Sequence, residues 1–163
     1  MLHASYEHLM QRLLRECEAY YQARLVSLVL YGSVARGTMR FDSDIDVLLI
    51  ADALPVGRRA RLLEFERIET QLQRDFEAAR RCGIHAEVSP LILSRPEVEH
   101  GSPLFLDMTL EARILYDREQ FFAAYLDGLR ARLRQLGAQR RRLRGGYYWL
   151  LKPDYRPGDR IEL

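Results

Sequence analysis

Apolar side chains recur along this chain in two patterns, one typical of amphipathic helices and the other of buried strands. In residues 4–22 and 58–81 they return every three or four positions, which is the spacing of a helix with one buried face. Residues 25–31, 44–50 and 84–93 instead form short apolar runs or alternate with polar residues, as strands do. These patterns predict a β-sheet covered by helices.

The second half of the chain continues in the same way. A short helix is expected at 101–112, a short strand at 113–116 and a long last helix at 118–144. Residues 145–153 lose the helical period, begin with two glycines and three aromatic residues, and are expected to be extended. We therefore predict one domain over residues 1–144, with its core at about 25–117, and a tail over 145–163 that is a candidate docking segment.

Composition narrows the class of protein. With 48% hydrophobic residues among 163, the chain can form a buried core, and no apolar run approaches the ~20 residues that cross a bilayer. The N-terminus has no basic region followed by an apolar segment, and the two cysteines are isolated. We therefore expect a cytoplasmic protein that has no signal peptide and does not enter a membrane.

The charge is informative in its distribution rather than its total. A net charge of +2 is too small to indicate a nucleic-acid-binding protein by itself. Seven arginines cluster between residues 130 and 144, where they form either the solvated end of the last helix or a surface for an acidic or RNA-associated partner. Direct binding of nucleic acid stays open at this point.

The residues with the clearest chemical meaning lie between the first two predicted strands. Gly32 and Ser33 break the apolar run that ends at Tyr31. Glycine allows a ligand to approach the backbone closely, and the start of a short helix offers free N–H groups to a phosphate. This turn therefore predicts a phosphate-binding site, to which the Ser33 hydroxyl adds a donor.

Two aspartates, Asp44 and Asp46, stand at the head of the next apolar run, although aspartate is depleted in strands. Because strand side chains alternate, the two carboxylates point the same way. At an effective dielectric near 20, carboxylates ~4 Å apart repel by roughly 4 kcal/mol, and a divalent cation would reverse the sign of this energy. Mg²⁺ prefers one or two carboxylates together with phosphate oxygens, so the pair predicts a magnesium site, with two ions expected.

Three further residues are candidates for the same site. Glu87, an acid within the third predicted strand, is the candidate third carboxylate, both catalytic base and metal ligand, if it shares a face with the aspartates. Otherwise it is a solvent-facing acid on an edge strand. Ser43 either bonds a phosphate or caps the turn, and Arg36 either reaches a phosphate or is solvated.

The pattern Gly32-Ser33, ten intervening residues and Asp44-Ile45-Asp46 resembles the signature of the DNA polymerase β-like nucleotidyltransferase superfamily. The chain looks like its minimal nucleotidyltransferases, short proteins that contain little more than the catalytic domain. Over residues 25–117 this resemblance implies an α/β (α+β) fold with a small mixed β-sheet.

The resemblance also implies a site. Asp44 and Asp46 match the metal-binding pair of the family, Gly32 and Ser33 match its phosphate-binding turn, and Glu87 matches a third acid that is more often aspartate. It implies Mg²⁺ as cofactor and a nucleoside triphosphate, usually ATP, as substrate.

Minimal members of this family are often encoded beside a HEPN-domain ribonuclease toxin, and characterised ones are antitoxins that move AMP onto a tyrosine of the toxin. The resemblance thus implies a protein adenylyltransferase that serves as antitoxin, with a HEPN-domain toxin as partner. Two alternatives stay open. One is an enzyme that modifies a small molecule such as an aminoglycoside, with a homodimer supplying the acceptor pocket. The other is a non-catalytic antitoxin that neutralises its partner by contact.

Overall fold

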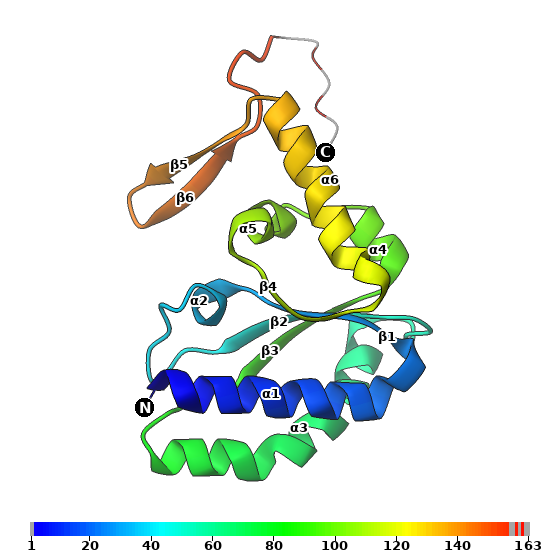
Figure 1. Cartoon of the computed structure of the whole chain (residues 1–163), viewed down its shortest axis with the longest axis vertical. Helices are drawn as coiled ribbons and strands as arrows, with labels where there is room; N and C mark the ends of the chain where they lie inside the picture. Colours follow the sequence, from blue (N-terminus) through cyan, green and yellow to red (C-terminus); the bar gives the residue numbers. More distant parts are fainter. Residues whose placement is uncertain (1, 157–158, 160, 162–163) are drawn as a thin grey trace.

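A mixed four-stranded sheet forms the centre of the molecule (Figure 1). The computed structural model describes residues 2–156, 159 and 161. Strand β1 (Leu25–Leu30) is antiparallel to both β2 (Ile45–Ala51) and β4 (Arg113–Asp117), whereas β3 (Val88–Leu93) is parallel to β2. The strand order is therefore β3-β2-β1-β4. The predicted α/β domain with a small mixed sheet covered by helices is confirmed.

Helices cover both faces of this sheet. Helices α1 (Leu2–Tyr21) and α3 (Arg58–Arg81) lie side by side on one face, and α4 (Arg95–Glu99), α5 (Leu104–Glu111) and α6 (Phe121–Gln135) lie on the other (Figure 1). The remaining short elements are η1 (Gln22–Arg24), α2 (Gly32–Ala35) and η2 (Arg118–Gln120). In the part of the chain that the structure describes, every helix is too short or too polar to span a lipid bilayer.

The central strands contribute alternate side chains to two hydrophobic cores. In β2, Ile45, Val47 and Leu49 enter the core beneath α1 and α3, while Leu48 and Ile50 enter the core beneath α5 and α6. Burial on both faces explains why these strands read as continuous apolar runs in the sequence. Asp46 is the single residue of β2 that is not fully buried, and alternation places it on the face of α5 and α6.

The last helix is shorter than predicted. It ends at Gln135 rather than residue 144, because Gly137 adopts a positive φ of 66°. The Ala138 N–H donates to the Leu133 carbonyl at 2.9 Å and the Gly137 N–H to the Arg134 carbonyl at 3.1 Å, which is a glycine-based helix end.

The arginine-rich segment after this helix end is a strand. Strands β5 (Gln139–Leu143) and β6 (Gly146–Leu150) form an antiparallel hairpin that projects from the body (Figure 1). The expectation of extended backbone after residue 145 is confirmed for β6, whereas the helical prediction for residues 139–144 is wrong. The division into a domain and a docking tail at residue 145 stays a prediction, and that boundary falls in the hairpin turn.

Two smaller differences concern the segment between α3 and β4. The third strand begins at Val88 instead of residue 84, although Ile84 and Ala86 are buried as the alternation required. Helix α4 was not predicted. Its start carries a capping box in which Ser94 and Glu97 bond each other's backbone, a pattern of serine followed three residues later by glutamate that is visible in the sequence.

Candidate functional site

The antiparallel pairing of β1 and β2 brings the glycine–serine turn next to the aspartates. Strand β1 ends where β2 begins, with Leu30 opposite Val47, and the Tyr31 N–H donates to the Asp46 carbonyl at 3.1 Å. The chain then turns at Gly32 into helix α2, whose first N–H groups lack partners within the helix. Two motifs separated by ten residues in the sequence thus meet at one end of the sheet.

Gly32 and Asp46 are in direct contact. A Cβ atom added to Gly32 would overlap with Oδ2 of Asp46 and would lie 3.1 Å from its Cγ. The φ of +71° at Gly32 also lies in the left-handed region that favours glycine. Glycine is therefore required here for two independent reasons, and one of them is the approach of a carboxylate to the turn.

The electrostatics of the pair favour a cation. Asp46 is half-buried, and burial raises the pKa of its carboxyl group above the ordinary value of 3.8. The charge of the exposed Asp44 raises the pKa further, while the guanidinium of Arg36 opposes the shift. The fold therefore concentrates negative charge in a partly desolvated place beside a turn that suits phosphate. Two such carboxylates fit a hard divalent cation such as Mg²⁺, which takes its other ligands from phosphate oxygens and water.

The loop that leads to Asp44 is anchored by helix α1. The hydroxyl of Tyr6 donates to the Ser43 carbonyl at 2.6 Å and lies 2.9 Å from the Arg40 carbonyl. Ser43 in turn accepts a hydrogen bond from the Arg40 N–H at 2.9 Å through its Oγ, so it holds the turn. A contact of Ser43 with phosphate stays a prediction. Tyr6 was not a predicted site residue. The helical pattern over residues 4–22 puts it on the buried face of α1, and the only signal of its contact with the loop is that a buried tyrosine hydroxyl needs a partner.

Arg36 lies on the turn and forms an ion pair with α5. Its Nη1 donates to Oε2 of Glu111 at 2.9 Å, and Glu111 also binds Arg140 of β5. The two arginines hold the pKa of Glu111 below its ordinary value, although burial acts in the opposite direction. Glu111 was not a predicted site residue, and nothing in its sequence neighbourhood indicated this contact. The binding of a phosphate by Arg36 stays a prediction.

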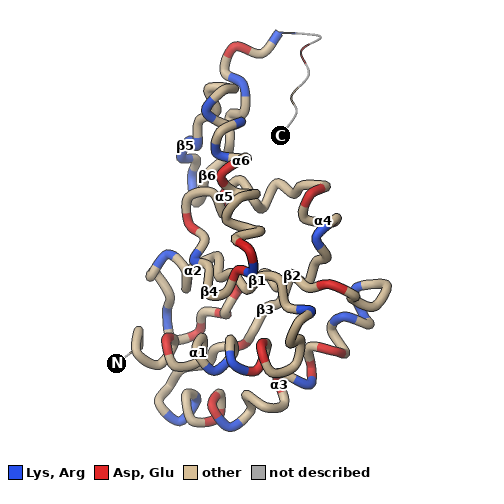
Figure 2. The backbone as a smooth tube through the Cα atoms, turned by 45° about the vertical axis from the view of Figure 1, so that its right-hand side comes forward, with Lys and Arg blue, Asp and Glu red and all other residues tan. Residues whose placement is uncertain are grey.

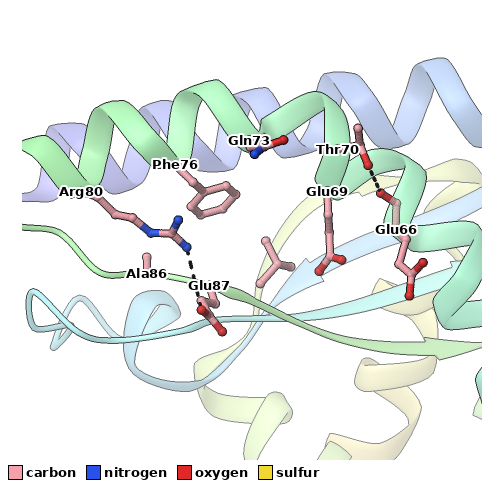
Figure 3. Close-up of a pocket in the computed structure, with 9 residues that line it drawn as sticks. Glu66, Glu69, Thr70, Gln73, Phe76, Arg80, Ala86 and Glu87 are labelled. Atoms are coloured by element: carbon pink, nitrogen blue, oxygen red, sulfur yellow. Dashed lines mark hydrogen bonds and ion pairs between the residues drawn. The ribbon is translucent and has the colours of Figure 1, made fainter.

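Glu87 directly precedes β3, and its side chain forms an ion pair with α3. Its carbonyl accepts a hydrogen bond from the Ile45 N–H at 2.7 Å, so its backbone adjoins β2. Its side chain is 77% exposed, however, and its nearest charged partner is Arg80 of α3 at 3.9 Å (Figure 3). Among the described residues, no group of three His, Cys, Asp or Glu side chains is arranged to hold a metal ion. The role of Glu87 as third carboxylate and base stays a prediction.

A cavity of about 480 Å³ lies under α3 and has Glu87 at its edge (Figure 3). Its other acidic residues are Glu66 and Glu69, and burial together with the charges of Glu66 and Glu87 raises the pKa of Glu69. The residues that line it do not include the glycine–serine turn or the aspartate pair. The cavity is thus separate from the place where the predicted phosphate and metal sites meet.

Comparison with known proteins agrees with this geometry. Residues 10–89 match the model of the family described as "Nucleotidyltransferase domain", a range that includes every predicted site residue. A protein of Methanocaldococcus jannaschii named "Putative protein adenylyltransferase" is 29% identical over 133 residues, which cover 79% of this chain and 84% of that protein.

Solved structures share the fold. A crystal structure of a toxin–antitoxin with AMP-PNP superposes with a TM-score of 0.51 at 17% identity, covering 77% of this chain and 89% of the other. A mutant of the toxin–antitoxin MntA-HpeT superposes with a TM-score of 0.50 at 16% identity and with the same coverage. At such low identity the likeness shows the fold alone.

Proposed function

We propose that this chain, a nucleotidyltransferase by the domain match over residues 10–89, moves AMP from ATP onto a hydroxyl group of a partner protein. The name of the archaeal relative supports transfer to a protein, and the fold shared with a toxin–antitoxin complex supports a toxin as the partner. In the family that the motifs resemble, the acceptor is a tyrosine of a HEPN-domain toxin. We propose the same acceptor here, with this chain as a cytoplasmic antitoxin.

The contact between Asp46 and Gly32, beside Asp44, is the observation that carries this proposal. Asp44 and Asp46 would hold Mg²⁺, which supplies positive charge that activates the attacking hydroxyl and neutralises the leaving pyrophosphate. Gly32 and Ser33 would bind the phosphates through backbone N–H groups and the serine hydroxyl.

The remaining predicted residues take supporting roles in this proposal. Arg36 would bind a phosphate oxygen in addition to Glu111, and Ser43 would contact a phosphate from the turn that it caps. Glu87 would orient or deprotonate the attacking hydroxyl. The Glu87 side chain is 77% exposed, and its ion pair with Arg80 is long at 3.9 Å, so little free energy opposes a change of its rotamer.

The proposal is tested with ATP that carries its label at either the α- or the γ-phosphate. The purified chain is incubated with each ATP, with Mg²⁺ and with the proposed HEPN-domain acceptor. We expect the partner to gain the α-label and not the γ-label, and mass spectrometry to place AMP on a tyrosine. Transfer of the γ-label would indicate a kinase, and neutralisation of the partner without any label would indicate a non-catalytic antitoxin. Either result would contradict the proposal.

A further inference from the structure

The β5–β6 hairpin and the helix end before it are strongly basic. Residues 128–153 contain eight lysines and arginines and no aspartate or glutamate. Figure 2 shows these cations gathered at the end of the molecule formed by α6 and β5. Arg141, Arg142 and Arg144 are exposed. Since the whole chain has a net charge of only +2, this surface is a local concentration of positive charge.

The same hairpin exposes large apolar and aromatic side chains. Leu143 is 63% exposed and Tyr147 is 59% exposed, and Tyr148 is also exposed. Arginine and tyrosine together are typical of the residues that dominate protein–protein binding energy. A two-stranded hairpin by itself is marginally stable in water, so this element depends on contacts outside its own two strands.

Among the residues that the structure describes, the ion pairs and hydrogen bonds between the hairpin and α5 come from one face of the hairpin. Arg140 and Trp149 are paired across the two strands, and both bind Asp107 of α5, at 3.2 Å and 2.9 Å respectively. Arg141 and Tyr148, the next pair, point to the opposite face because strand side chains alternate. The hairpin is thus held to α5 by its inner face, and its outer face is presented to solvent.

The attachment of the hairpin is connected to the nucleotide turn. Glu111, at the end of α5, binds Arg140 of the hairpin and also Arg36 of the turn. Arg36 acts electrostatically on Asp46. In Figure 1 the hairpin lies on the same side of the sheet as α5. A molecule that docks on the hairpin is therefore held near the reaction centre, where an acceptor must be.

We propose that the outer face of the β5–β6 hairpin is the docking surface for the acceptor protein, and that the matching face of the acceptor is acidic. This inference rests on the proposed transfer to a partner protein. Residues 128–153 carry positive charge and no acidic residue, so the partner surface that complements them electrostatically is acidic. Single-stranded nucleic acid would use the arginines for its phosphates and Tyr148 for stacking of its bases. The exposed Leu143 on the outer face has no such use, and together with the link to the site it favours a protein.

The test uses charge reversal at Arg141, on the outer face, and at Arg144, in the hairpin turn. The hairpin variant carries Arg141→Glu and Arg144→Glu, neither of which contacts α5. The control variant carries the same charge change on α3, with Arg58→Glu and Arg59→Glu, both exposed and on the opposite side of the sheet. The readouts are the KM for the HEPN-domain acceptor, the KM for ATP, kcat and direct binding of the acceptor by biolayer interferometry.

We expect the hairpin variant to raise the KM for the acceptor and its Kd about tenfold or more, with kcat and the KM for ATP unchanged. Added salt should weaken acceptor binding by the wild type and have little further effect on the variant. The control variant, and an Arg141→Lys, Arg144→Lys variant that keeps the charge, should match the wild type. Thermal melting must show that all variants fold.

Three outcomes would overturn the inference. The first is an acceptor KM and Kd that charge reversal on the hairpin leaves unchanged, and the second is an equal loss in the control variant. The third is a hairpin variant that still binds the acceptor but no longer binds a fluorescein-labelled single-stranded RNA of about 20 nucleotides that the wild type binds. This result would assign the surface to nucleic acid. If the wild type binds the acceptor but labels nothing, the proposed function fails, and the interferometry still decides whether the hairpin is the docking surface.

Discussion

Replacing Asp46 by asparagine should stabilise the free protein while it abolishes transfer. The carboxylates of Asp44 and Asp46 stand two residues apart at the start of a strand, roughly 6.6 Å along the chain. Their repulsion is about 0.6 kcal/mol at the dielectric of water and about 2.5 kcal/mol at an effective dielectric of 20. Because Asp44 is exposed, a value near 1 kcal/mol is expected, which raises the melting temperature of a chain of this size by about 2–4 °C.

The sign of the pH dependence follows from the raised pKa of Asp46. A carboxyl group whose pKa is higher in the folded state destabilises the fold when it is ionised, and this cost disappears as the pH falls. The stability difference between the Asp46→Asn variant and the wild type should therefore be complete above the folded-state pKa. It should shrink as the pH falls through that value and vanish below the unfolded value of 3.8.

The order of stabilities should reverse when Mg²⁺ and ATP are added. A ligand at one hundred times its Kd stabilises the folded state by about 2.7 kcal/mol, or about 5–10 °C for a domain of this size. The wild type should show this rise and the Asp46→Asn variant should lose most of it. Asp42→Asn, which removes an exposed carboxylate from the same loop, is the matched control and should behave like the wild type in both conditions.

Thermal melts followed by circular dichroism at pH 8 and at pH 4, with and without Mg²⁺ and ATP, measure these differences. A lower melting temperature of the free Asp46→Asn protein at pH 8 would refute the reasoning, since the carboxylate would then contribute a favourable structural contact. Equal stabilisation of variant and wild type by Mg²⁺ and ATP would refute the assignment of Asp46 to the metal.

Three further predictions concern the elements around the site. Gly32→Ala should lower the free energy of unfolding and should also lower kcat by about tenfold or more, because the new Cβ displaces Asp46. Gly83→Ala is the matched control, since Gly83 has a similar positive φ of 79° but open space around it. It should lose only the roughly 1–2 kcal/mol that an alanine costs in the left-handed region. Tyr6→Phe should lower the free energy of unfolding by about 1–3 kcal/mol in chemical denaturation, because the Ser43 carbonyl loses its donor. Tyr21→Phe should be neutral or slightly stabilising, because the buried hydroxyl of Tyr21 has no hydrogen-bond partner among the described residues. Removal of divalent ions with EDTA should abolish labelling and leave the far-ultraviolet circular dichroism spectrum unchanged. In the same labelling assay, added Mg²⁺ should restore transfer and added Ca²⁺ should not.

The sequence was sufficient for the features that depend on local pattern. Gly32 and Asp46 could be placed together because a strand, a turn and an antiparallel strand leave few other arrangements for so short a connection. The central strands were recognisable because burial on both faces makes them continuously apolar.

Features that depend on tertiary contacts could not be predicted. Residues 139–144 carry arginines that suit a helix, and only pairing with the aromatic strand and the contact of Trp149 with Asp107 make them a strand. Glu111 and Tyr6 act on the site from other elements through side-chain hydrogen bonds, which leave no periodic signal in the sequence. The Glu87 side chain has Arg80, seven residues earlier on α3, as an ion-pair partner, and strand alternation alone gave no sign of this contact.

Labelling of the partner by a chain that lacks both carboxylates tests the central claim most directly. The Asp44→Asn, Asp46→Asn double variant is compared with the wild type in the presence of α-labelled ATP, Mg²⁺ and the HEPN-domain acceptor, at matched and verified folding. The account predicts that transfer of label falls by at least about a hundredfold, which corresponds to roughly 2.7 kcal/mol of lost transition-state stabilisation. Labelling at the wild-type rate by the folded double variant would contradict the account.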